Sequence, residues 1–535
     1  MKLYVSTCST ACVIQTEKRQ LFYGGQKKMY ALTSAEMRYM DEYTISGGLS
    51  GSVLMENAAR GLADEVAKRF ADKSTSILVV FGYGKNGGDA VAAARWLLHF
   101  GYKNVRMYYA GPLDRISKEL ADQLNILIKA YPTVEIGRLR KVDQNEILHA
   151  KYDVIIDGLY GIGLNRALGT TDTGFANYIN SKSAYKVAVD IPSGLNATTG
   201  IVMSAAIRAD LTVTFGNYKT GMFFGAGREY CGEIKLVDIG LMESGYKDIP
   251  NKLLVCDRDY YEAGREKALR ERSESGHKGT FGTVGIAVSS NGMLGASMLA
   301  ARAAYRSGCG LVKIFCPSKY VGFFNVSIPE AVAVPYKSDD VIGAFEDFIA
   351  GVDAMLIGPG LREDEEGRLL VKKALSGTVP AVLDAGALNL LSDNLKMLRK
   401  RKCPCVITPH LGELAKLCKT DVATIASNRV GIISKFSEEF DISMVAKSDV
   451  SIISLIDERG EKSLYINTVG NSGLATAGSG DVLAGVIASL IAQGNTLNNS
   501  LLYGVMTHGA AAEKFATDAD EKRKMMATDI IDKLF

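Results

Sequence analysis

The sequence has little of what several protein classes need. No stretch approaches the roughly 20 unbroken apolar residues of a membrane span. There are only five histidines, so a histidine-rich metal site is not expected. The nine cysteines are scattered without a CxxC pair, which disfavours a disulfide scaffold or a zinc knuckle. Such cysteine usage favours a reducing compartment, and we expect the cytoplasm.

An excess of charge of one sign is also absent. The chain has 62 basic and 59 acidic residues, which gives a formal net charge of +3. This balance provides no strong attraction for nucleic acid or for an anionic membrane. We therefore expect neither as a partner.

What is present is the composition of a folded protein of more than one domain. At 535 residues the chain is too long for one ordinary core, so two or three domains are expected. Hydrophobic residues make up 47% and charged residues 23%, as in globular proteins. Residues 1–28 contain only a weak apolar stretch, rich in Ser and Thr. We predict a poorly structured tail there, with a targeting segment as the alternative.

After the tail, short apolar runs alternate with helical patterns. Thr33 and Glu36 have the spacing of a capping box, which predicts a helix after them. A buried strand at 76–81 leads into a glycine-rich segment at 82–89, and a helix is predicted over 90–100. Further buried strands are predicted at 105–110, 152–157, 185–190 and 209–215. Continuous Val and Ile runs between helices are typical of a parallel sheet with helices on both faces.

The pattern weakens near residue 245, and a second β/α series follows. We predict a Rossmann-like three-layer domain at 29–245, a linker at 246–256 and a second α/β domain at 257–535. A long helix is expected to begin near Asp481. The strands of the second series are predicted at 283–289, 311–316, 354–357, 381–384, 406–408 and 442–446, with a hairpin-like pair at 450–455 and 463–467.

Three loops of the first half carry residues suited to ligand binding. The segment Gly-Tyr-Gly-Lys-Asn-Gly-Gly-Asp at 82–89 lies between a strand and a helix, where backbone amides can approach a phosphate. Asp157 ends a strand before a glycine-containing loop at 161–166, and Asp190 ends another before a loop at 191–194. In a parallel sheet these loops meet at one edge. Singly, each feature also fits a plain turn or a helix cap.

These three loops resemble the signature loops of the NAD(P)H-hydrate epimerase family. The resemblance spans about residues 29–241 and implies interconversion of the R and S forms of hydrated NADH and NADPH. Ala90 stands where the family usually has Gly. The resemblance implies substrate contacts at Lys85, Asn86, Gly87, Gly88, Asp89, Gly161, Ile162, Gly163, Leu164, Asn165, Arg166 and Ala167, and a potassium ion near Asn86, Asp157 and Ser193.

Epimerisation needs proton transfer, with either ring opening or loss and return of the hydroxyl at C6. Asp190 is the candidate acid or base, because a carboxyl with a tuned pKa can serve as either. Lys219 is a possible acid or phosphate partner, although a solvated loop lysine would look the same in the sequence.

The clearest motif of the second half is Ala-Gly-Ser-Gly-Asp at 477–481. The glycine-rich part can hold a phosphate on backbone amides where a helix begins. Asp481 can take a proton from a nearby hydroxyl. The pattern therefore predicts a phosphoryl-transfer site with Asp481 as the base.

Residues 257–535 resemble the ribokinase-like superfamily, and within it the ADP/ATP-dependent NAD(P)H-hydrate dehydratases. The narrower resemblance lies in the segments at 277–282, 295–301, 307–310, 358–360, 384–389 and 408–413. It implies that the hydrated nucleotide contacts Ala296, Gly360, His410 and Asp481, and that the phosphate donor contacts Lys447, Ser448, Asp449, Val450, Ser451 and Gly480. Ser448 and Ser451 depart from the usual Gly and Thr.

Together the two resemblances predict a bifunctional repair enzyme, an isomerase joined to a lyase. The second domain would phosphorylate the C6 hydroxyl of the S form with ADP or ATP, with Mg²⁺ shielding the donor phosphates. Loss of phosphate would restore NAD(P)H. The alternative is a ribokinase-like kinase for a vitamin precursor or sugar, with a non-catalytic nucleotide-binding N-terminal module. We also expect a homo-oligomer.

Overall fold

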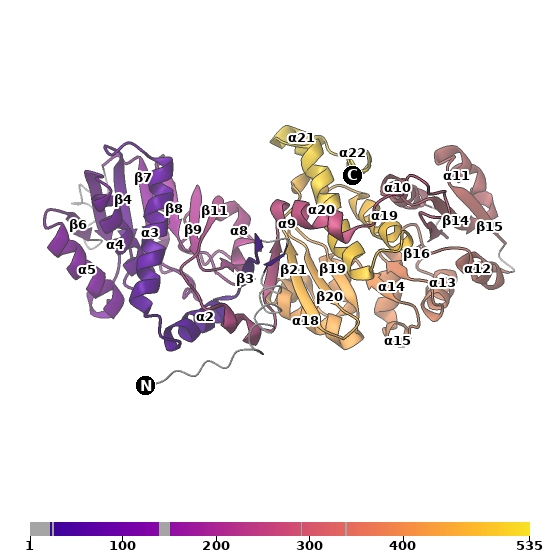
Figure 1. Ribbon diagram of the computed structural model, residues 1–535, viewed down its shortest axis with the longest axis horizontal. Coiled ribbons are helices and arrows are strands. Elements are labelled where there is room, and N and C mark those ends of the chain that lie inside the picture. The colour runs from indigo at the N-terminus through magenta and orange to yellow at the C-terminus, as the bar shows by residue number, and fades with distance from the viewer. Residues whose placement is uncertain (1–21, 24–25, 139–149, 290–291, 338–339) are drawn as a thin grey trace, which may run out of the picture. The chain divides into compact units, whose positions relative to one another are not determined.

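The computed structural model describes residues 22–23, 26–138, 150–289, 292–337 and 340–535 (Figure 1). Within these residues the chain divides into two compact units, one at Met29–Leu253 and one beginning at Leu254. Most of the tail predicted at 1–28 lies outside the described residues. Its described part includes a short antiparallel pair, β1 (Phe22–Tyr23) with β2 (Gln26–Lys27).

The first unit contains a parallel sheet in the order β11-β9-β8-β7-β4-β5-β6. The outer strands β6 and β11 were not predicted, because they are partly exposed and lack the continuous apolar run of a buried strand. The strands are β4 (Ser76–Phe81), β5 (Asn104–Tyr109), β6 (Glu135–Arg138), β7 (Val154–Gly158), β8 (Tyr185–Val189), β9 (Leu211–Phe215) and β11 (Glu233–Val237).

Helices cover both faces of this sheet. Successive residues of a strand point to opposite faces. Ile155 of β7 packs with Phe175 of α7 (Thr170–Asn180), whereas a Cβ on Gly158 of the same strand would lie 2.4 Å from the Cβ of Ala90 in α4 (Lys85–His99). The two helices therefore lie on opposite faces, and the unit has three layers, as predicted. The other main helices are α2 (Ser34–Ser46), α3 (Gly51–Arg69) and α5 (Lys118–Ala130).

Two local features place functional loops. Thr33 caps α2 with the predicted capping box, because its side chain accepts from the Glu36 amide and the Glu36 carboxylate accepts from Thr33. Strand β3 (Tyr30–Leu32) pairs in parallel with β10 (Tyr218–Lys219), which fixes the backbone at Lys219. A short α8 (Gly227–Tyr230) precedes β11.

Helix α4 begins earlier than the sequence indicated. It includes Asn86, Gly87 and Gly88, whereas the sequence predicts the helix only from residue 90, after adjacent glycines that weaken a helix. Packing explains the difference: a Cβ on Gly87 would lie 2.1 Å from the carbonyl oxygen of Gly82, and one on Gly88 would lie 2.8 Å from Cε of Met55. These glycines therefore allow the start of α4 to pack closely against the backbone of Gly82 and the side chain of Met55.

The second unit contains a mixed sheet in the order β12-β21-β20-β19-β18-β17-β16-β13-β14-β15. The strands from β19 to β15 are parallel, and β20 and β21 form the predicted antiparallel hairpin. The bounds are β13 (Thr283–Ala287), β14 (Leu311–Pro317), β15 (Val332–Tyr336), β16 (Ala354–Ile357), β17 (Ala381–Leu383), β18 (Cys405–Ile407), β19 (Ser443–Ala446), β20 (Ile452–Ile456) and β21 (Lys462–Asn467).

The segment predicted as a linker at 246–256 contains regular structure. It includes the end of a 3₁₀ helix (Glu243–Asp248) and all of β12 (Leu253–Cys256), whose four residues are buried. The apolar Leu-Leu-Val-Cys run is long enough for a strand, but the preceding Pro250 and the flanking charges suggested a linker.

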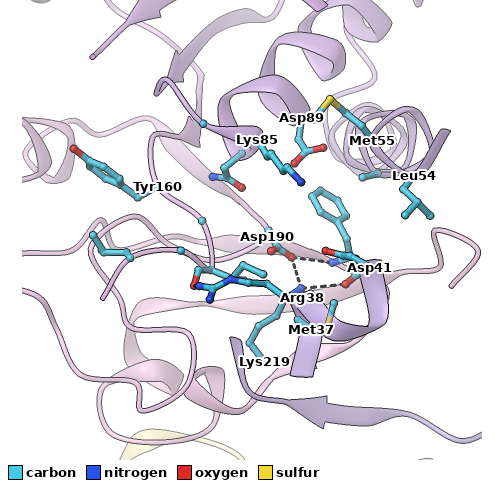
Figure 2. A pocket seen from close by; sticks show the side chains of 18 of the residues that line it. Met37, Arg38, Asp41, Leu54, Met55, Lys85, Asp89, Tyr160, Asp190 and Lys219 are labelled. Carbon is cyan, nitrogen blue, oxygen red and sulfur yellow. Dashed lines mark hydrogen bonds and ion pairs between the residues drawn. The ribbon is translucent and has the colours of Figure 1, made fainter. Parts of the chain in front are cut away.

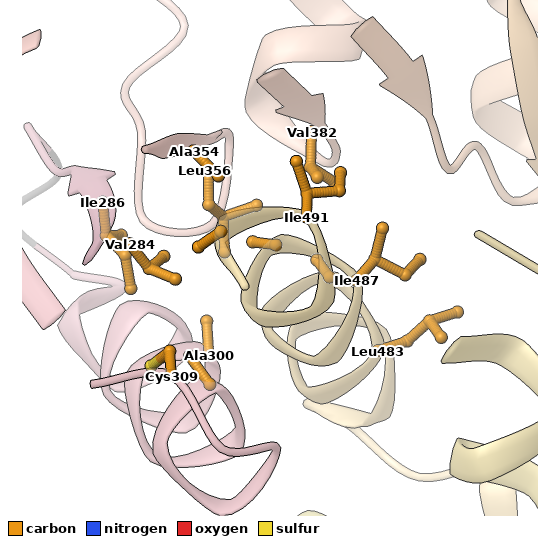
Figure 3. Packing of buried hydrophobic residues seen from close by; sticks show 14 of the residues in the cluster. Val284, Ile286, Ala300, Cys309, Ala354, Leu356, Val382, Leu483, Ile487 and Ile491 are labelled. Carbon is orange, nitrogen blue, oxygen red and sulfur yellow. The ribbon is translucent and has the colours of Figure 1, made fainter. Parts of the chain in front are cut away.

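The core of the second unit lies between its sheet and the helices α10 (Leu294–Arg306) and α19 (Ser479–Ala492). Figure 3 shows Ile487 and Ile491 of α19 beside Leu356 and Val382 of the sheet. Burying one such isoleucine contributes about 2 kcal/mol to folding. The two helices approach closely, because a Cβ on Gly485 would lie 2.2 Å from the carbonyl oxygen of Ala300.

The remaining helices of this unit surround the sheet. They are α9 (Arg258–Ala268), α11 (Val321–Ser327), α12 (Val341–Ala350), α13 (Glu365–Ser376), α14 (Gly386–Asp393), α15 (Lys396–Arg399), α16 (Leu411–Leu417), α17 (Val422–Ser427), α18 (Arg429–Phe440), α20 (Leu497–Phe515), α21 (Ala519–Lys524) and α22 (Ala527–Asp532). No helix among the described residues has the length and apolar character needed to cross a membrane.

Candidate active sites

The first unit has a cavity of about 520 Å³ at the carboxyl ends of its central strands (Figure 2). The loops after β4, β7 and β8 meet there, as predicted for a parallel sheet. The predicted residues that line it are Lys85, Asn86, Asp89, Gly161, Ile162, Gly163, Leu164, Asn165, Arg166 and Asp190. Gly87, Gly88 and Ala167 do not line it.

The sequence did not indicate the opposite wall of this cavity, which comes from α2 and α3. Its members are Met37, Arg38, Asp41, Ile45, Gly51, Leu54, Met55 and Ala58. A sequence signal was present, because Met37, Asp41 and Ile45 repeat every four residues along α2 and so share one face. An acidic residue on an otherwise apolar helix stripe marks a polar site within that stripe.

Asp190 and Lys219 form a buried ion pair on the cavity floor. The Lys219 side chain is 1% exposed and the Asp190 side chain 13%. The Lys219 ammonium donates to Asp190 Oδ1, to Thr214 Oγ1 at 2.8 Å and to the Phe215 carbonyl at 3.0 Å. Asp190 Oδ1 also accepts from Thr214 Oγ1 and from the Phe215 amide, each at 3.1 Å. Lys219 is thus a buried partner of Asp190, not a solvated loop lysine.

Two further carboxyls reach the same cavity. Asp41 of α2 and Asp89 of α4 have no hydrogen-bond or ion-pair partner within the part of the chain that the structure describes. Burial raises the pKa of Asp41 to about 6, with Lys219 opposing the shift and Asp190 adding to it. Burial and the neighbouring Asp190 raise the pKa of Asp89 well above its usual range. The cavity therefore holds more carboxyls than its buried lysine can neutralise.

The predicted potassium ligands Asp157 and Ser193 are joined directly. Asp157 Oδ1 accepts from Ser193 Oγ at 2.6 Å, and Asp157 Oδ2 accepts from the Ser193 amide at 2.8 Å. Asp157 is fully buried, and burial raises its pKa to about 6. The Asn86 side chain is also buried, with no partner for its amide nitrogen among the described residues.

These residues fit a potassium ion. A buried carboxylate without a cation is costly, and a monovalent cation would offset that cost. Hard cations take oxygen ligands, which Asp157, Ser193 and the Asn86 carbonyl can supply. Across the described residues, no group of three or more His, Cys, Asp or Glu side chains could hold a metal ion, so a site built from carboxylates and imidazoles alone is not present there.

In the second unit, Asp481 lies in the first turn of α19, next to a buried lysine–carboxylate pair. Lys447 Nζ contacts Asp384 Oδ1 at 2.7 Å, and a Cβ on Gly480 would lie 3.2 Å from the same nitrogen. Burial raises the pKa of Asp481 to about 6, with Asp384 and Glu413 adding to the shift and Lys447 opposing it. The helix is preceded by Gly478, whose φ of +87° is favourable only for glycine.

The other predicted substrate contacts fall into two groups. His410 caps α16: its Nδ1 accepts from the amides of Gly412 at 3.0 Å and Glu413 at 3.2 Å, and its side chain stays 60% exposed. Gly360 lies beside the start of α10, next to Ala296, because a Cβ on Gly360 would lie 2.4 Å from Oγ of Ser297. Within the described residues, no hydrogen bond or ion pair joins this second group to Asp481.

The segment predicted to bind the phosphate donor is tied to a buried arginine. Arg429 Nη1 donates to Ser448 Oγ and to Asp449 Oδ1, each at 3.1 Å. Ser448 Oγ in turn donates to the Val450 carbonyl at 2.7 Å. Ser451 accepts from the Asn467 amide through its backbone at 3.0 Å. Ser448 therefore gives the loop internal support that a glycine could not provide.

A buried histidine behind α19 was missed in the sequence. His508 of α20 places Nε2 3.3 Å from Oγ of Ser479, the first residue of α19. Burial lowers the pKa of His508 to about 4, so it is neutral at physiological pH. Its position inside a long apolar helix gave no signal of this contact.

The folds and sites define a chain of two α/β enzymes: a Rossmann-like unit with an acid–base cavity, and a second unit with a helix N-terminus suited to a phosphate. Two family models match the chain. One is described as YjeF-related protein N-terminus and matches residues 51–221, and the other is described as NAD(P)H-hydrate dehydratase and matches residues 284–535.

Relatives match over nearly the whole chain. The bifunctional NAD(P)H-hydrate repair enzyme of Moorella thermoacetica is 35% identical over 94% of this chain and 96% of its own length. That of Escherichia coli strain K12 is 31% identical over 85% of this chain and 84% of its own length. A solved ADP/ATP-dependent NAD(P)H-hydrate dehydratase from Bacillus subtilis, co-crystallised with ATP and Mg²⁺, matches 51% of this chain and 94% of its own, with 28% identity and a TM-score of 0.43.

The chain therefore belongs to the family of bifunctional NAD(P)H-hydrate repair enzymes. The predictions of the family, of the two fold types and of an enzyme with two repair activities are confirmed. The alternative of a vitamin or sugar kinase with a non-catalytic first module is not favoured.

Proposed function

We propose that this chain restores hydrated NADH and NADPH, with the first unit interconverting the R and S epimers and the second dehydrating the S epimer with ADP or ATP. The observation that carries the proposal is similarity to bifunctional repair enzymes along almost the whole chain, including both units. The fusion has a chemical reason, because a dehydratase specific for one epimer leaves the other unrepaired unless an epimerase converts it.

In the first unit, Asp190 is the proposed acid–base residue and the loop at 161–166 lies over the substrate. Asp190 is held in place by Lys219, Thr214 and the Phe215 amide, so its orientation is fixed before substrate binds. Arg38 contacts the carbonyl of Ile162 at 3.4 Å and helps to hold that loop. Asn86, Asp157 and Ser193 are the residues that would hold potassium, whose positive charge would balance the buried Asp157 carboxylate.

In the second unit, Asp481 is the proposed base for phosphorylation of the C6 hydroxyl. Asp481 takes the hydroxyl proton as the oxygen bonds to the terminal phosphorus of the donor, and AMP or ADP leaves with the bridging oxygen. The C6–O bond then breaks, and phosphate leaves with the electron pair as the ring nitrogen forms a double bond to C6. Loss of a proton from C5 restores the dihydronicotinamide.

Several residues around Asp481 support this step. The amides at the start of α19 point at the position of a phosphate and carry the partial positive charge of the helix N-terminus. Lys447 is held by Asp384 beside Gly480, where it adds a full positive charge. Mg²⁺ would bind through the donor phosphates and a carboxylate, for which Glu413 near Asp481 is the candidate, and it would neutralise phosphate charge.

The test is recovery of NADH from a mixture of the two epimers. The purified chain is incubated with R- and S-hydrated NADH, Mg²⁺, K⁺ and either ADP or ATP, and the dihydronicotinamide absorbance is followed. We expect full recovery with at least one nucleotide. If recovery stops once the S epimer is consumed, and the R epimer is then converted only at the rate of spontaneous epimerisation, the epimerase assignment is contradicted. No recovery with either nucleotide would contradict the repair function.

A further inference from the structure

The cavity of the first unit contains a carboxyl that the family resemblance did not assign. Asp41 lies on α2, on the wall opposite the loops after β4, β7 and β8. Figure 2 shows Asp41, Asp89 and Asp190 reaching the cavity from different elements. Asp41 is half-buried and has no hydrogen-bond or ion-pair partner among the described residues. A carboxyl in this position is costly to keep unless it has a use there.

Epimerisation requires two proton transfers at different atoms, and Asp190 can perform only one of them. If Asp190 takes the hydroxyl proton, another group must donate to the ring nitrogen. Lys219 is poorly placed to do so, because its three ammonium hydrogens are directed at Asp190, Thr214 and the Phe215 carbonyl. It is also only 1% exposed. Lys219 therefore positions Asp190 and has no hydrogen left for the substrate.

We propose that Asp41 is the second acid–base residue of the epimerase site and works opposite Asp190. The proposal rests on the epimerase function proposed above. It assigns the fixed carboxylate, Asp190, to the hydroxyl and the unpartnered carboxyl, Asp41, to the ring nitrogen.

The proton transfers balance if the ring opens. Asp190 takes the proton of the C6 hydroxyl, C6 becomes an aldehyde, and the C6–N1 bond breaks with its electron pair on nitrogen. Asp41 delivers its proton to that nitrogen. Rotation about C5–C6 turns the other face of the aldehyde to the nitrogen, and ring closure then reverses both proton transfers. Each carboxyl returns to its starting state, and only the configuration at C6 has changed.

The protonation of Asp41 suits this role. Burial raises its pKa to about 6, so acid and carboxylate forms are both present near neutral pH. Burial and the neighbouring Asp190 raise the pKa of Asp89, the other unpartnered carboxyl, well above its usual range. A group that must give up and regain a proton in each cycle works best when its pKa is near the operating pH. The charged groups that act on Asp41 are Lys219, Lys85, Asp190, Asp89 and Glu42, and Arg38 and Arg166 line the same cavity.

The test measures epimerisation separately from dehydration in full-length variants. Asp41→Asn keeps the shape of the side chain and removes its proton, and Glu42→Gln makes the same change at the next, exposed residue of α2. The R-to-S conversion rate is measured without nucleotide by separating the epimers. We expect Asp41→Asn to lower the kcat of epimerisation by about 100-fold or more, with Glu42→Gln close to wild type. Dehydration of pure S epimer should be unchanged in both, which shows that the second unit is active, and thermal unfolding like that of the wild type shows that the first unit is folded.

The pH profile separates acid–base chemistry from binding. In the wild type, kcat/KM of epimerisation should fall as pH rises through about 6, because the proposed acid is lost. That limb should disappear in Asp41→Asn and return in Asp41→Glu, which restores a titrating carboxyl. A rise in KM with unchanged kcat and an unchanged limb in Asp41→Asn would overturn the proposal. If the wild type itself does not epimerise, the proposed function fails, and that result is distinguishable from the loss of Asp41 alone.

Discussion

At the scale of single residues, the site residues that directly follow strands could be predicted from the sequence. The residues on the opposite wall of the cavity could not. Asp157 and Asp190 could be predicted, because residues after parallel strands meet at one edge whatever the details of packing. The apolar stripe on α2 marks Asp41 as a polar position, but Asp41 could not be placed opposite these loops, because the stripe does not show which loops the helix faces. The burial of Lys219 was equally hidden, because it depends on the short pairing of β10 with β3.

The raised pKa of Asp481 gives a prediction on activity. As a base it must be ionised, and its pKa of about 6 places its protonation just below neutral pH. The dehydration rate should therefore fall as pH drops through about 6. Asp481→Asn should be slower by about 100- to 10,000-fold and should lose this pH dependence. Initial rates with pure S epimer at several pH values measure both effects. Wild-type dehydration by the variant would remove Asp481 from the mechanism.

The raised pKa of Asp481 also predicts a pH dependence of stability. It runs opposite to that of activity, because ionisation of Asp481 favours catalysis but destabilises the fold. A carboxyl whose pKa is raised in the folded state stabilises the fold when protonated, and that stabilisation is lost as pH rises through about 6. Asp481→Asn removes the ionised form, so its Tm should exceed that of wild type at pH 7. The difference should shrink towards pH 5. A lower Tm at pH 7 would mean that the carboxylate has a stabilising partner.

At the scale of elements, the buried strands could be predicted from apolar runs, whereas the element boundaries depend on packing. The buried central strands of both sheets were predicted within one or two residues. The start of α4 was misplaced, because the sequence shows the helix-weakening glycines but not the backbone of Gly82 that they must accommodate. Strand β12 was missed since its charged flanks outweighed four buried residues.

The close packing at the start of α4 predicts different outcomes for two glycine substitutions. In Gly87→Ala the new Cβ would lie 2.1 Å from the Gly82 carbonyl oxygen, which as backbone cannot move aside cheaply. We expect destabilisation of the first unit by about 1–3 kcal/mol, with loss of epimerisation. Gly174 lies inside α7 with nothing within 4 Å of a new Cβ, so Gly174→Ala should stabilise the helix by about 0.5–1 kcal/mol. Thermal unfolding of both variants measures these changes, and equal Tm values would contradict the packing argument.

At the scale of the whole molecule, two complete enzymes share one chain. Each unit has its own sheet and its own set of site residues. The division was predictable from sequence, because two β/α series of sufficient length each imply a separate core. How the epimer passes from one site to the other is a separate physical question, with free diffusion as the simplest answer.

Free diffusion predicts that two defective chains complement each other in solution. Asp190→Asn removes the proposed epimerase carboxylate while keeping a residue that tolerates the φ of +65° at this position. Asp481→Asn removes the dehydratase base. Each variant alone should fail to convert R epimer to NADH above the spontaneous rate. An equimolar mixture of the two variants should recover NADH from both epimers. Its rate should equal that of a wild-type sample with the same concentration of intact epimerase sites and of intact dehydratase sites.

The comparison with wild type decides between diffusion and transfer within one chain. If the S epimer reaches the second site through solvent, it makes no difference which chain produced it, so the mixture and the wild type give the same time course. If the S epimer passed directly between sites on one chain, the mixture would show a lag that the wild type lacks. The lag should then shorten as the concentration of both variants rises, because diffusion between chains depends on concentration and transfer within one chain does not.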